Sequence, residues 1–324
     1  MKKKIRLLDL GTIEWYKSQT IYHVIAESVS EDGMDTVILC RPDTPYFCIG
    51  YHQEFDDIFD RQRINKMGIP VMRREIGGGA TYLDSNQFFY QFIFSKENVP
   101  PSFGDIFGHF LRVPVSVLKR LGMNAGLRAT NEIEVEGKRV AGTGGGFIGN
   151  ACAVVGNFLI DFNYDAMTDA WSCPSESFRE LASIALRENV RTLSSFGRAR
   201  SYGEIRDIFE DELKIILEAD LKKVTLDEAT HLRSEKLKEE LTVLGEKERQ
   251  ADQERKVLKI SADVHIHYER MIVNGSEIRA SLLVRNGMIE KIFPDPGVLK
   301  PGVTELVGTR LSDLKRRTAI VEVD

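Results

Sequence analysis

The stretch Arg73–Asp84 reads RREIGGGATYLD, with two arginines directly before three consecutive glycines. Residues 69–73 before the glycines and 88–94 after them are largely apolar, so we predict a strand on each side. In 88–94 the side chains on both faces are largely apolar, which predicts a central strand buried on both sides. Glycines let backbone N–H groups approach an anion, and arginine offers a planar fork for carboxylate or phosphate. The stretch therefore predicts an anion-binding loop rather than an ordinary flexible surface loop.

A second informative stretch, Asn131–Gly144, reads NEIEVEGKRVAGTG. Glu136-Gly137 predicts a tight turn between two extended segments, and Lys138 follows the turn directly. A lysine is usually a solvated surface residue. In this context Lys138 is well placed to bridge a carboxylate and an α-phosphate and to stabilise charge on phosphorus during adenylation. Neither stretch has the spacing of a phosphate-binding P-loop or a dinucleotide fingerprint.

These two stretches, in this order and separation, resemble the lipoate and biotin protein ligase superfamily, and within it lipoate–protein ligase. Members carry an Arg-Arg-x-Ser-Gly-Gly-Gly-Ala-Val-x-His-Asp segment, an Asn-Asp pair before Gly-Lys-Lys-Ile-Ser-Gly, and an apolar strand opened by glycine. Here that strand is 156–161, GNFLID, and residues 49–53, IGYHQ, resemble the family's Gly-x-x-Gln segment. The resemblance covers about residues 1–220, and the chain from about residue 264 resembles the small accessory domain of these ligases.

The resemblance implies an enzyme that uses ATP and Mg²⁺ to activate lipoate as lipoyl-AMP and then modifies a lysine of a carrier protein. The expected carrier is a glycine-cleavage H-like protein, a dehydrogenase E2 lipoyl domain or a specialised lipoate-binding protein. Lys138 is the implied catalytic residue, and Asn131 and Glu132 would lie near the metal-bound phosphate, with no metal ligands assigned. The substrate- and ATP-binding residues that the resemblance implies are Arg73, Arg74, Gly77, Gly78, Gly79, Ala80, Thr81, Tyr82, Asp84, Asn131, Glu132, Gly142 and Thr143.

Three positions depart from the family pattern. Glu75-Ile76 replaces the usual x-Ser, and Leu83 replaces the family histidine. These two replacements affect the expected shape of the lipoyl pocket and any proton transfer by that histidine. Glu132 replaces aspartate and keeps a carboxylate.

The main alternative enzyme is an octanoyl or lipoyl transferase that acts through a Cys152 thioester. Transferases of the superfamily carry a cysteine four residues before the equivalent glycine, and Cys152 stands four residues before Gly156. The competing interpretation is a small buried residue, because Val155 stands where those transferases have histidine and no base adjoins the thiol. Biotin ligation and a non-catalytic protein that binds lipoate or the carrier are further alternatives.

The expected fold is α/β (α+β), with a mixed sheet flanked by helices and a small C-terminal α+β domain. We predict a catalytic domain over 1–222, a charged, exposed helical linker over 223–259 and an accessory domain over 260–324. Ser201 with Glu204 and Thr225 with Glu228 predict capping boxes. Asn274-Gly275 and Asn286-Gly287 predict the turns of a three-stranded meander, in which His265 and His267 would lie on an exposed strand face. The longer helices are expected over 12–29, 55–67 and 103–121.

The bulk composition excludes several classes of protein. The net charge of −5, from 44 basic and 49 acidic residues, argues against a broad nucleic-acid-binding surface. No apolar run is long enough to span a membrane, and the basic start lacks the apolar stretch of a secretory signal, so we expect a cytoplasmic protein. Four isolated cysteines are expected to be reduced thiols.

Overall fold

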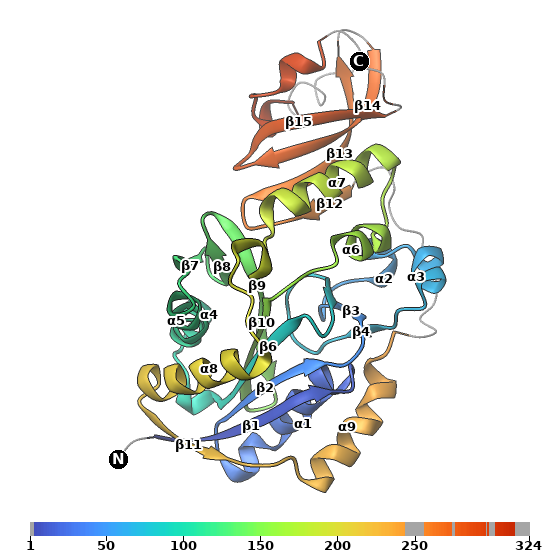
Figure 1. The fold of residues 1–324 in the computed structure, drawn as a ribbon. Coiled ribbons are helices and arrows are strands. Elements are labelled where there is room, and N and C mark those ends of the chain that lie inside the picture. The colour runs from blue at the N-terminus through green and yellow to red at the C-terminus, as the bar shows by residue number, and fades with distance from the viewer. Residues whose placement is uncertain (1–2, 244–255, 274–275, 296, 298–301, 315–324) are drawn as a thin grey trace. The chain divides into compact units, whose positions relative to one another are not determined.

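The computed structural model describes residues 3–243, 256–273, 276–295, 297 and 302–314 (Figure 1). The chain divides into two compact units, each made of separate segments. The first contains residues 1–55, 67–163 and 191–247, and the second contains residues 56–66, 164–190 and 248–324. Residues 56–66 and 164–190 lie within the predicted catalytic domain, but they belong to the same unit as the C-terminal sheet. In the described ranges no helix is long and apolar enough to cross a membrane.

An eight-stranded mixed sheet forms the centre of the first unit and confirms the expected fold class. β1 pairs in parallel with both β11 and β2, and the remaining pairs are antiparallel. β6 lies fourth in the sheet with eight of its nine residues buried, as expected for a central strand. In spatial order the strands are β11 (Ala219–Lys223), β1 (Lys3–Ile13), β2 (Thr36–Pro42), β6 (Gln87–Ser95), β10 (Ala151–Leu159), β9 (Lys138–Ile148), β8 (Glu132–Val135) and β7 (Ala125–Arg128).

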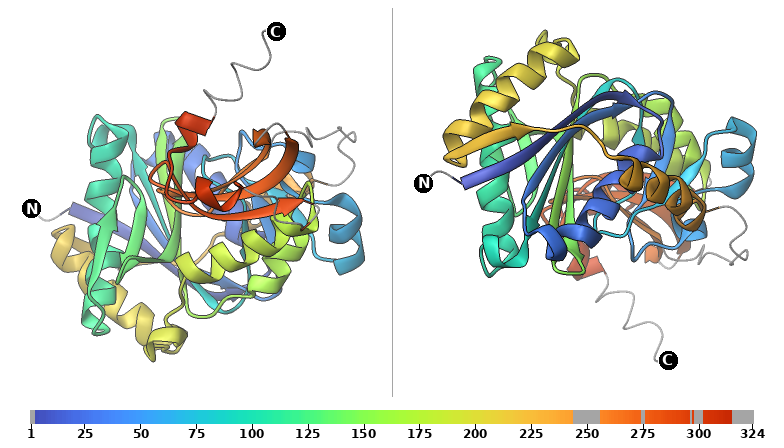
Figure 2. Two further views of the ribbon diagram at one scale, coloured as in Figure 1. Left: turned by 90° about the horizontal axis from the view of Figure 1, so that it is seen from above. Right: turned by 90° about the horizontal axis from the view of Figure 1, so that it is seen from below.

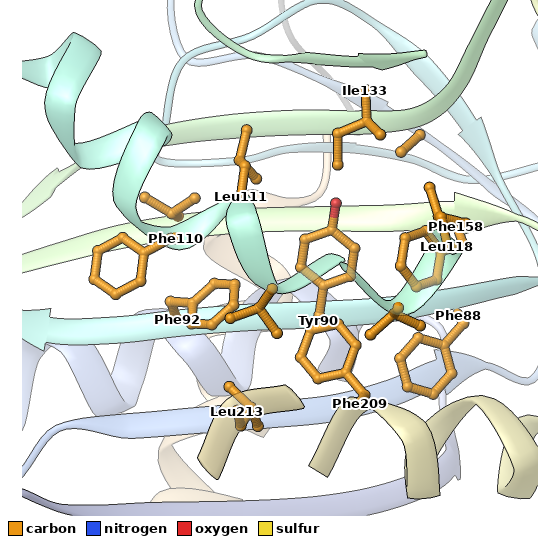
Figure 3. Packing of buried hydrophobic residues seen from close by; sticks show 14 of the residues in the cluster. Phe88, Tyr90, Phe92, Phe110, Leu111, Leu118, Ile133, Phe158, Phe209 and Leu213 are labelled. Atoms are coloured by element: carbon orange, nitrogen blue, oxygen red, sulfur yellow. The ribbon is translucent and has the colours of Figure 1, made fainter. Parts of the chain in front are cut away.

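One face of this sheet, here called the aromatic face, packs against three helices. Tyr90 lies among other aromatic rings, including Phe158 and Phe209 (Figure 3). Its ring centroid is 5.2 Å from that of Phe158 and 5.3 Å from that of Phe209. The helices are α4 (Phe103–Phe110), α5 (Arg112–Arg120) and α8 (Tyr202–Ile216), whose apolar side chains share one core with the strands. The Ser201–Glu204 capping box that starts α8 is confirmed.

The single helix expected over 103–121 is instead two helices that meet at Leu111. Pro114 lies in the first turn of α5. Proline has no N–H to donate to the carbonyl four residues earlier, and its ring collides with that carbonyl, so one continuous helix cannot form across it. The helix expected over 55–67 is likewise divided, into α2 (Phe55–Ile58) and α3 (Arg61–Met67).

The opposite face, here called the glycine-loop face, packs against α1 (Lys17–Asp32), which the two views of Figure 2 show beside β1 and β2. A second sheet continues the structure on this side, in the order β4 (Val71–Arg73), β3 (Tyr46–Ile49), β5 (Thr81–Leu83). Residues 74–80 connect β4 to β5, and we call them the glycine loop.

The charged helix was expected to be an exposed linker, and this is wrong for its described part. α9 (Glu228–Leu241) packs on α1, where the hydroxyls of Thr20 and Ser234 are 2.6 Å apart and Leu237 is buried. Its N-cap is Asp227, which accepts a 2.8 Å hydrogen bond from the Thr230 N–H, rather than Thr225. Residues 244–255 of the predicted linker lie outside the described residues.

The second unit contains a four-stranded antiparallel sheet, which includes the expected meander and one further strand. Asn286 and Gly287 both have positive φ, 50° and 78°, as the predicted hairpin turn requires, while Asn274-Gly275 lies outside the described residues. α7 packs against three of the strands. The elements are α6 (Tyr164–Ala170), α7 (Glu176–Asn189), β12 (Lys256–Lys259), β13 (Val264–Val273), β14 (Ser276–Arg285) and β15 (Met288–Asp295).

The strand face that carries the two β13 histidines is largely covered, contrary to expectation. His267 pairs with Leu282, which belongs to an apolar core with Val303 and Leu306. The side chains of His267 and Glu269 are only 14% and 9% exposed. Among the described residues no group of three or more His, Cys, Asp or Glu side chains could hold a metal ion.

Candidate functional site

The glycine loop is closed by the side chain of Arg74, which is 6% exposed. Its Nη2 donates to the Gly79 carbonyl at 2.8 Å, and its Nε and Nη2 lie 3.4 Å from the Gly77 carbonyl. Its Nη1 lies 3.6 Å from the buried thiol of Cys48. The guanidinium expected to bind an anion thus also holds the loop in shape. The half-buried Arg73 donates from Nη1 to the Gln53 carbonyl.

Close backbone approach explains the glycines around this loop. A Cβ on Gly50 would lie 2.1 Å from the Gly78 carbonyl oxygen, and a Cβ on Gly144 would lie 2.7 Å from the Gly77 carbonyl oxygen. Gly78 has φ +123°, which only glycine adopts readily. The loop therefore lies against the backbone of β9, and larger residues at these positions would displace it.

Ile76 is a buried residue that anchors the glycine loop, and the accessible residues of the loop follow it. Ile76 is 1% exposed and lies in the core beneath α1, where its Cγ2 would be 3.2 Å from a Cβ on Gly146. Gly78 and Gly79 are exposed, and Ala80 and Thr81 are half-buried. The isoleucine that replaces the expected serine thus serves as an apolar anchor and leaves the next residues open to a ligand.

A chain of buried amides links the end of the loop to β9. The Gln87 Nε2 donates to the Tyr82 carbonyl at 3.2 Å, and the Asn157 Nδ2 donates to the Gln87 Oε1. The Asn157 Oδ1 would lie 2.8 Å from a Cβ on Gly142, so the amide packs on that glycine. Neither Gln87 nor Asn157 is among the site residues predicted from the sequence. The sequence signal that could have identified them is a polar residue in a strand whose other residues are apolar and expected to be buried.

Tyr82 and Asp84 are buried, and both stabilise the segment that follows the glycine loop. Asp84 accepts a 2.9 Å hydrogen bond from the Asn86 N–H in the turn before β6. Burial raises the pKa of the Asp84 carboxyl, and burial together with Asp84 raises the pKa of Tyr82 to about 12. Tyr82 also packs edge-on against Phe47, at 5.5 Å between ring centroids.

The hairpin between β8 and β9 has the expected turn, with Glu136 at φ 52° and Gly137 at φ 73°. Lys138 is half-buried at the start of β9, where it pairs with Val135, and its side chain makes no hydrogen bond or ion pair within the described ranges. The hydroxyl of Thr143 donates to the carbonyl of Asn131. This bond joins two of the predicted site residues, Thr143 in β9 and Asn131 in the turn before β8.

Cys152 lies on the other side of the sheet. Its side chain is fully buried in the core of the aromatic face, whereas the neighbouring Ala153 faces the glycine loop with Ile76. Burial raises the pKa of the Cys152 thiol to about 11, so the thiol is protonated at neutral pH.

A family model described as lipoyl protein ligase A/B catalytic domain matches residues 15–214. Lipoate-protein ligase LplJ of Bacillus subtilis is 25% identical over 168 residues, which are 51% of this chain and 49% of that protein. Octanoyltransferase LipM of Oceanobacillus iheyensis is 23% identical over 212 residues, 60% of this chain and 77% of that protein. The chain thus spans about half the length of LplJ and more of LipM.

Solved structures share the fold at low identity. A bi-partite lipoate protein ligase from Thermoplasma acidophilum, described with its E2 lipoyl domain, has a TM-score of 0.65 and 22% identity, covering 73% of this chain and 92% of that one. P. falciparum LipL1 in complex with lipoate has a TM-score of 0.62 and 14% identity, covering 98% of this chain and 89% of that one.

Proposed function

Because this chain belongs to the lipoyl protein ligase A/B catalytic-domain family, we propose that it is an ATP-dependent lipoate–protein ligase. It would activate lipoate as lipoyl-AMP and transfer the lipoyl group to a lysine of a lipoyl-accepting carrier protein. The observation that carries this proposal is the glycine loop, which lies against the strand that begins with Lys138 and Arg139. An exposed backbone segment beside a strand that begins with two cations suits an anionic acyl-adenylate.

Two half-reactions follow from this proposal. The lipoate carboxylate oxygen attacks the α-phosphorus of Mg·ATP, and the bond to pyrophosphate breaks as the mixed anhydride forms. The neutral amine of the carrier lysine then attacks the acyl carbon, an amide forms, and AMP leaves with the electron pair of the broken bond. A cation beside the α-phosphate, the role expected of Lys138, would stabilise the charge that develops at phosphorus. Asn131 and Glu132 are the residues proposed to lie near the metal-bound phosphate.

A second candidate function is acyl transfer through a Cys152 thioester, and the similarity to an octanoyltransferase is the observation that favours it. That chemistry needs an accessible thiolate. Cys152 is fully buried, its pKa is raised by burial, and it points away from the glycine loop. These features support the ligase over the transferase.

The deciding experiment incubates the purified chain with lipoate and Mg·ATP, without any carrier, and measures pyrophosphate and lipoyl-AMP. A ligase releases both in equal amounts. If the folded protein forms no adenylate but gains an octanoyl group on Cys152 from an octanoylated carrier, the transferase is correct. If it does neither and still binds lipoate, it is a binding protein.

A further inference from the structure

The pairing of β8 with β9 separates the two adjacent cations onto opposite faces of the sheet. Ile133 pairs with Ala141, and both belong to the core of the aromatic face. The register then shifts by one residue, so that Val140, buried in the same core, is extra in β9. Such a bulge reverses the alternation of the residues beyond it.

Beyond the shift, Val135 pairs with Lys138 and Glu134 pairs with Arg139. Val135 is buried in the core of the aromatic face, so Lys138 begins on that side. Because paired residues share a face and neighbours alternate, Arg139 lies on the opposite side with Glu134. That is the face on which the glycine loop lies and on which Gly142 contacts Asn157.

The Arg139 side chain carries a buried donor that no described group of the protein satisfies. Its Nε is buried and, among the described residues, makes no hydrogen bond. A buried donor left without a partner costs about 1–3 kcal/mol, so a site that keeps one usually has a ligand or water to satisfy it. Burial lowers the pKa of Arg139, and the charge of Glu132 opposes this change. Glu132 is 7% exposed and lies two residues before Glu134, on the same face.

We propose that Arg139, rather than Lys138, is the cation that binds the acyl-adenylate, and that Glu132 is the residue that positions its guanidinium. The inference rests on the proposed ligase function and changes which side chain meets the anion. A guanidinium offers two parallel donors and stays charged at any working pH, so it can hold the carboxylate oxygen and the α-phosphate together. Glu132 then has a task other than holding the metal.

The test compares Arg139→Ala, Arg139→Lys and Lys138→Ala, with Lys222→Ala on the exposed edge strand β11 as a control. Adenylate formation is measured as pyrophosphate release, and binding of lipoyl-AMP is measured by calorimetry. We expect Arg139→Ala to lower kcat/KM by about 100-fold or more and to weaken lipoyl-AMP binding, because it removes charge stabilisation at phosphorus. Arg139→Lys should recover part of the loss, and Lys138→Ala should lose less than about tenfold.

Glu132→Gln separates the two roles of that carboxylate. A positioning residue should, when neutralised, weaken lipoyl-AMP binding while the Mg²⁺ concentration for half-maximal rate stays the same. A rise in that Mg²⁺ concentration would instead make Glu132 a metal-site residue and overturn its assignment. If Arg139→Ala does not fold, the same measurements on Arg139→Lys and Glu132→Gln test the proposal.

A folded Arg139→Ala variant with near wild-type activity, beside an inactive Lys138→Ala variant, overturns the proposal and leaves the ligase function intact. Failure of the wild-type chain to form lipoyl-AMP removes the ligase function itself and, with it, the basis of this inference.

Discussion

The two faces of β6 and β10 differ sharply in chemistry although they belong to the same strands. On the aromatic face the strands present Phe88, Tyr90 and Phe158, packed ring against ring. On the glycine-loop face they present Gln87 and Asn157, joined by a hydrogen bond and leading to the loop. Alternation thus divides one pair of strands into a face that stabilises the fold and a face that shapes the site. Neighbouring residues in one strand can therefore be used to test the two roles separately.

The largest effect is expected from Phe158→Ala, which opens a cavity in the aromatic core. Such truncations cost about 3–5 kcal/mol of the free energy of unfolding. Chemical denaturation measures the loss, and ligation per folded molecule should remain close to wild type. Leu232→Ala, on the exposed side of α9, is the control and should change stability by less than about 0.5 kcal/mol. Loss of activity in a fully folded Phe158→Ala variant would show that the two faces are not independent.

Gly144→Ala should act on the opposite face and mainly on activity. Its Cβ would lie 2.7 Å from the Gly77 carbonyl oxygen, so the loop must move. Misplacement of about 1 Å can cost about 100-fold in rate, which is the loss we expect in kcat/KM for adenylation. Gly126→Ala on the edge strand β7 meets no atom within 4 Å and serves as the control. Unchanged kinetics for Gly144→Ala would mean that the position of the loop does not matter.

Asn157→Ala should give a smaller loss, about tenfold in kcat/KM, together with about 1–3 kcal/mol of stability, because the buried Gln87 oxygen loses its donor. The double variant Gln87→Met with Asn157→Ala removes both side-chain amides. It should regain only part of the stability, because the Tyr82 carbonyl loses its donor, and it should not regain activity. Thermal unfolding measures the stability of each variant, and pyrophosphate release measures its activity. Recovery of both properties in the double variant would make the amide pair purely structural.

Cys152→Ala should have the smallest effect, less than about twofold on ligation. In the native protein the thiol should resist iodoacetamide at pH 8, because burial raises its pKa from 9.0 to about 11. A raised pKa means that the folded state favours the protonated thiol, so this contribution to stability is complete below about pH 9 and is lost as pH rises through about 11. Rapid labelling of Cys152 at pH 8 in the folded protein would contradict its placement.

Local sequence signals identified much of the fold. The alternation in 88–94 predicted the central strand, and the turn residues at 136–137 and 286–287 adopt the positive φ values expected of them. α7 was missed although Phe178, Leu181 and Ala185 have helical spacing and Ser175 caps the helix. β1 was not assigned because charged residues interrupt its apolar ones.

The parts of the site that escaped prediction depend on pairing between distant strands. Nothing in the local sequence indicates that Val140 is an extra residue in β9, yet this shift decides which face Arg139 occupies. The partnership of Gln87 with Asn157 joins residues 70 positions apart. The anchoring of Ile76 beneath α1 and the docking of α9 likewise arise only when remote segments pack together.

The second unit is built from segments that are far apart in the sequence, and this affects how it folds during synthesis on the ribosome. α7 ends at Asn189, but the strands against which it packs run from Val264 to Asp295. At ordinary translation rates of about 5–20 residues per second, the apolar face of α7 stays uncovered for roughly 5–20 s after the helix is made. During that interval the nascent chain presents Phe178, Leu181 and Leu186 to other chains and to chaperones. Slowing translation between codons 190 and 295 should therefore lower the soluble yield, whereas slowing it after codon 314 should not.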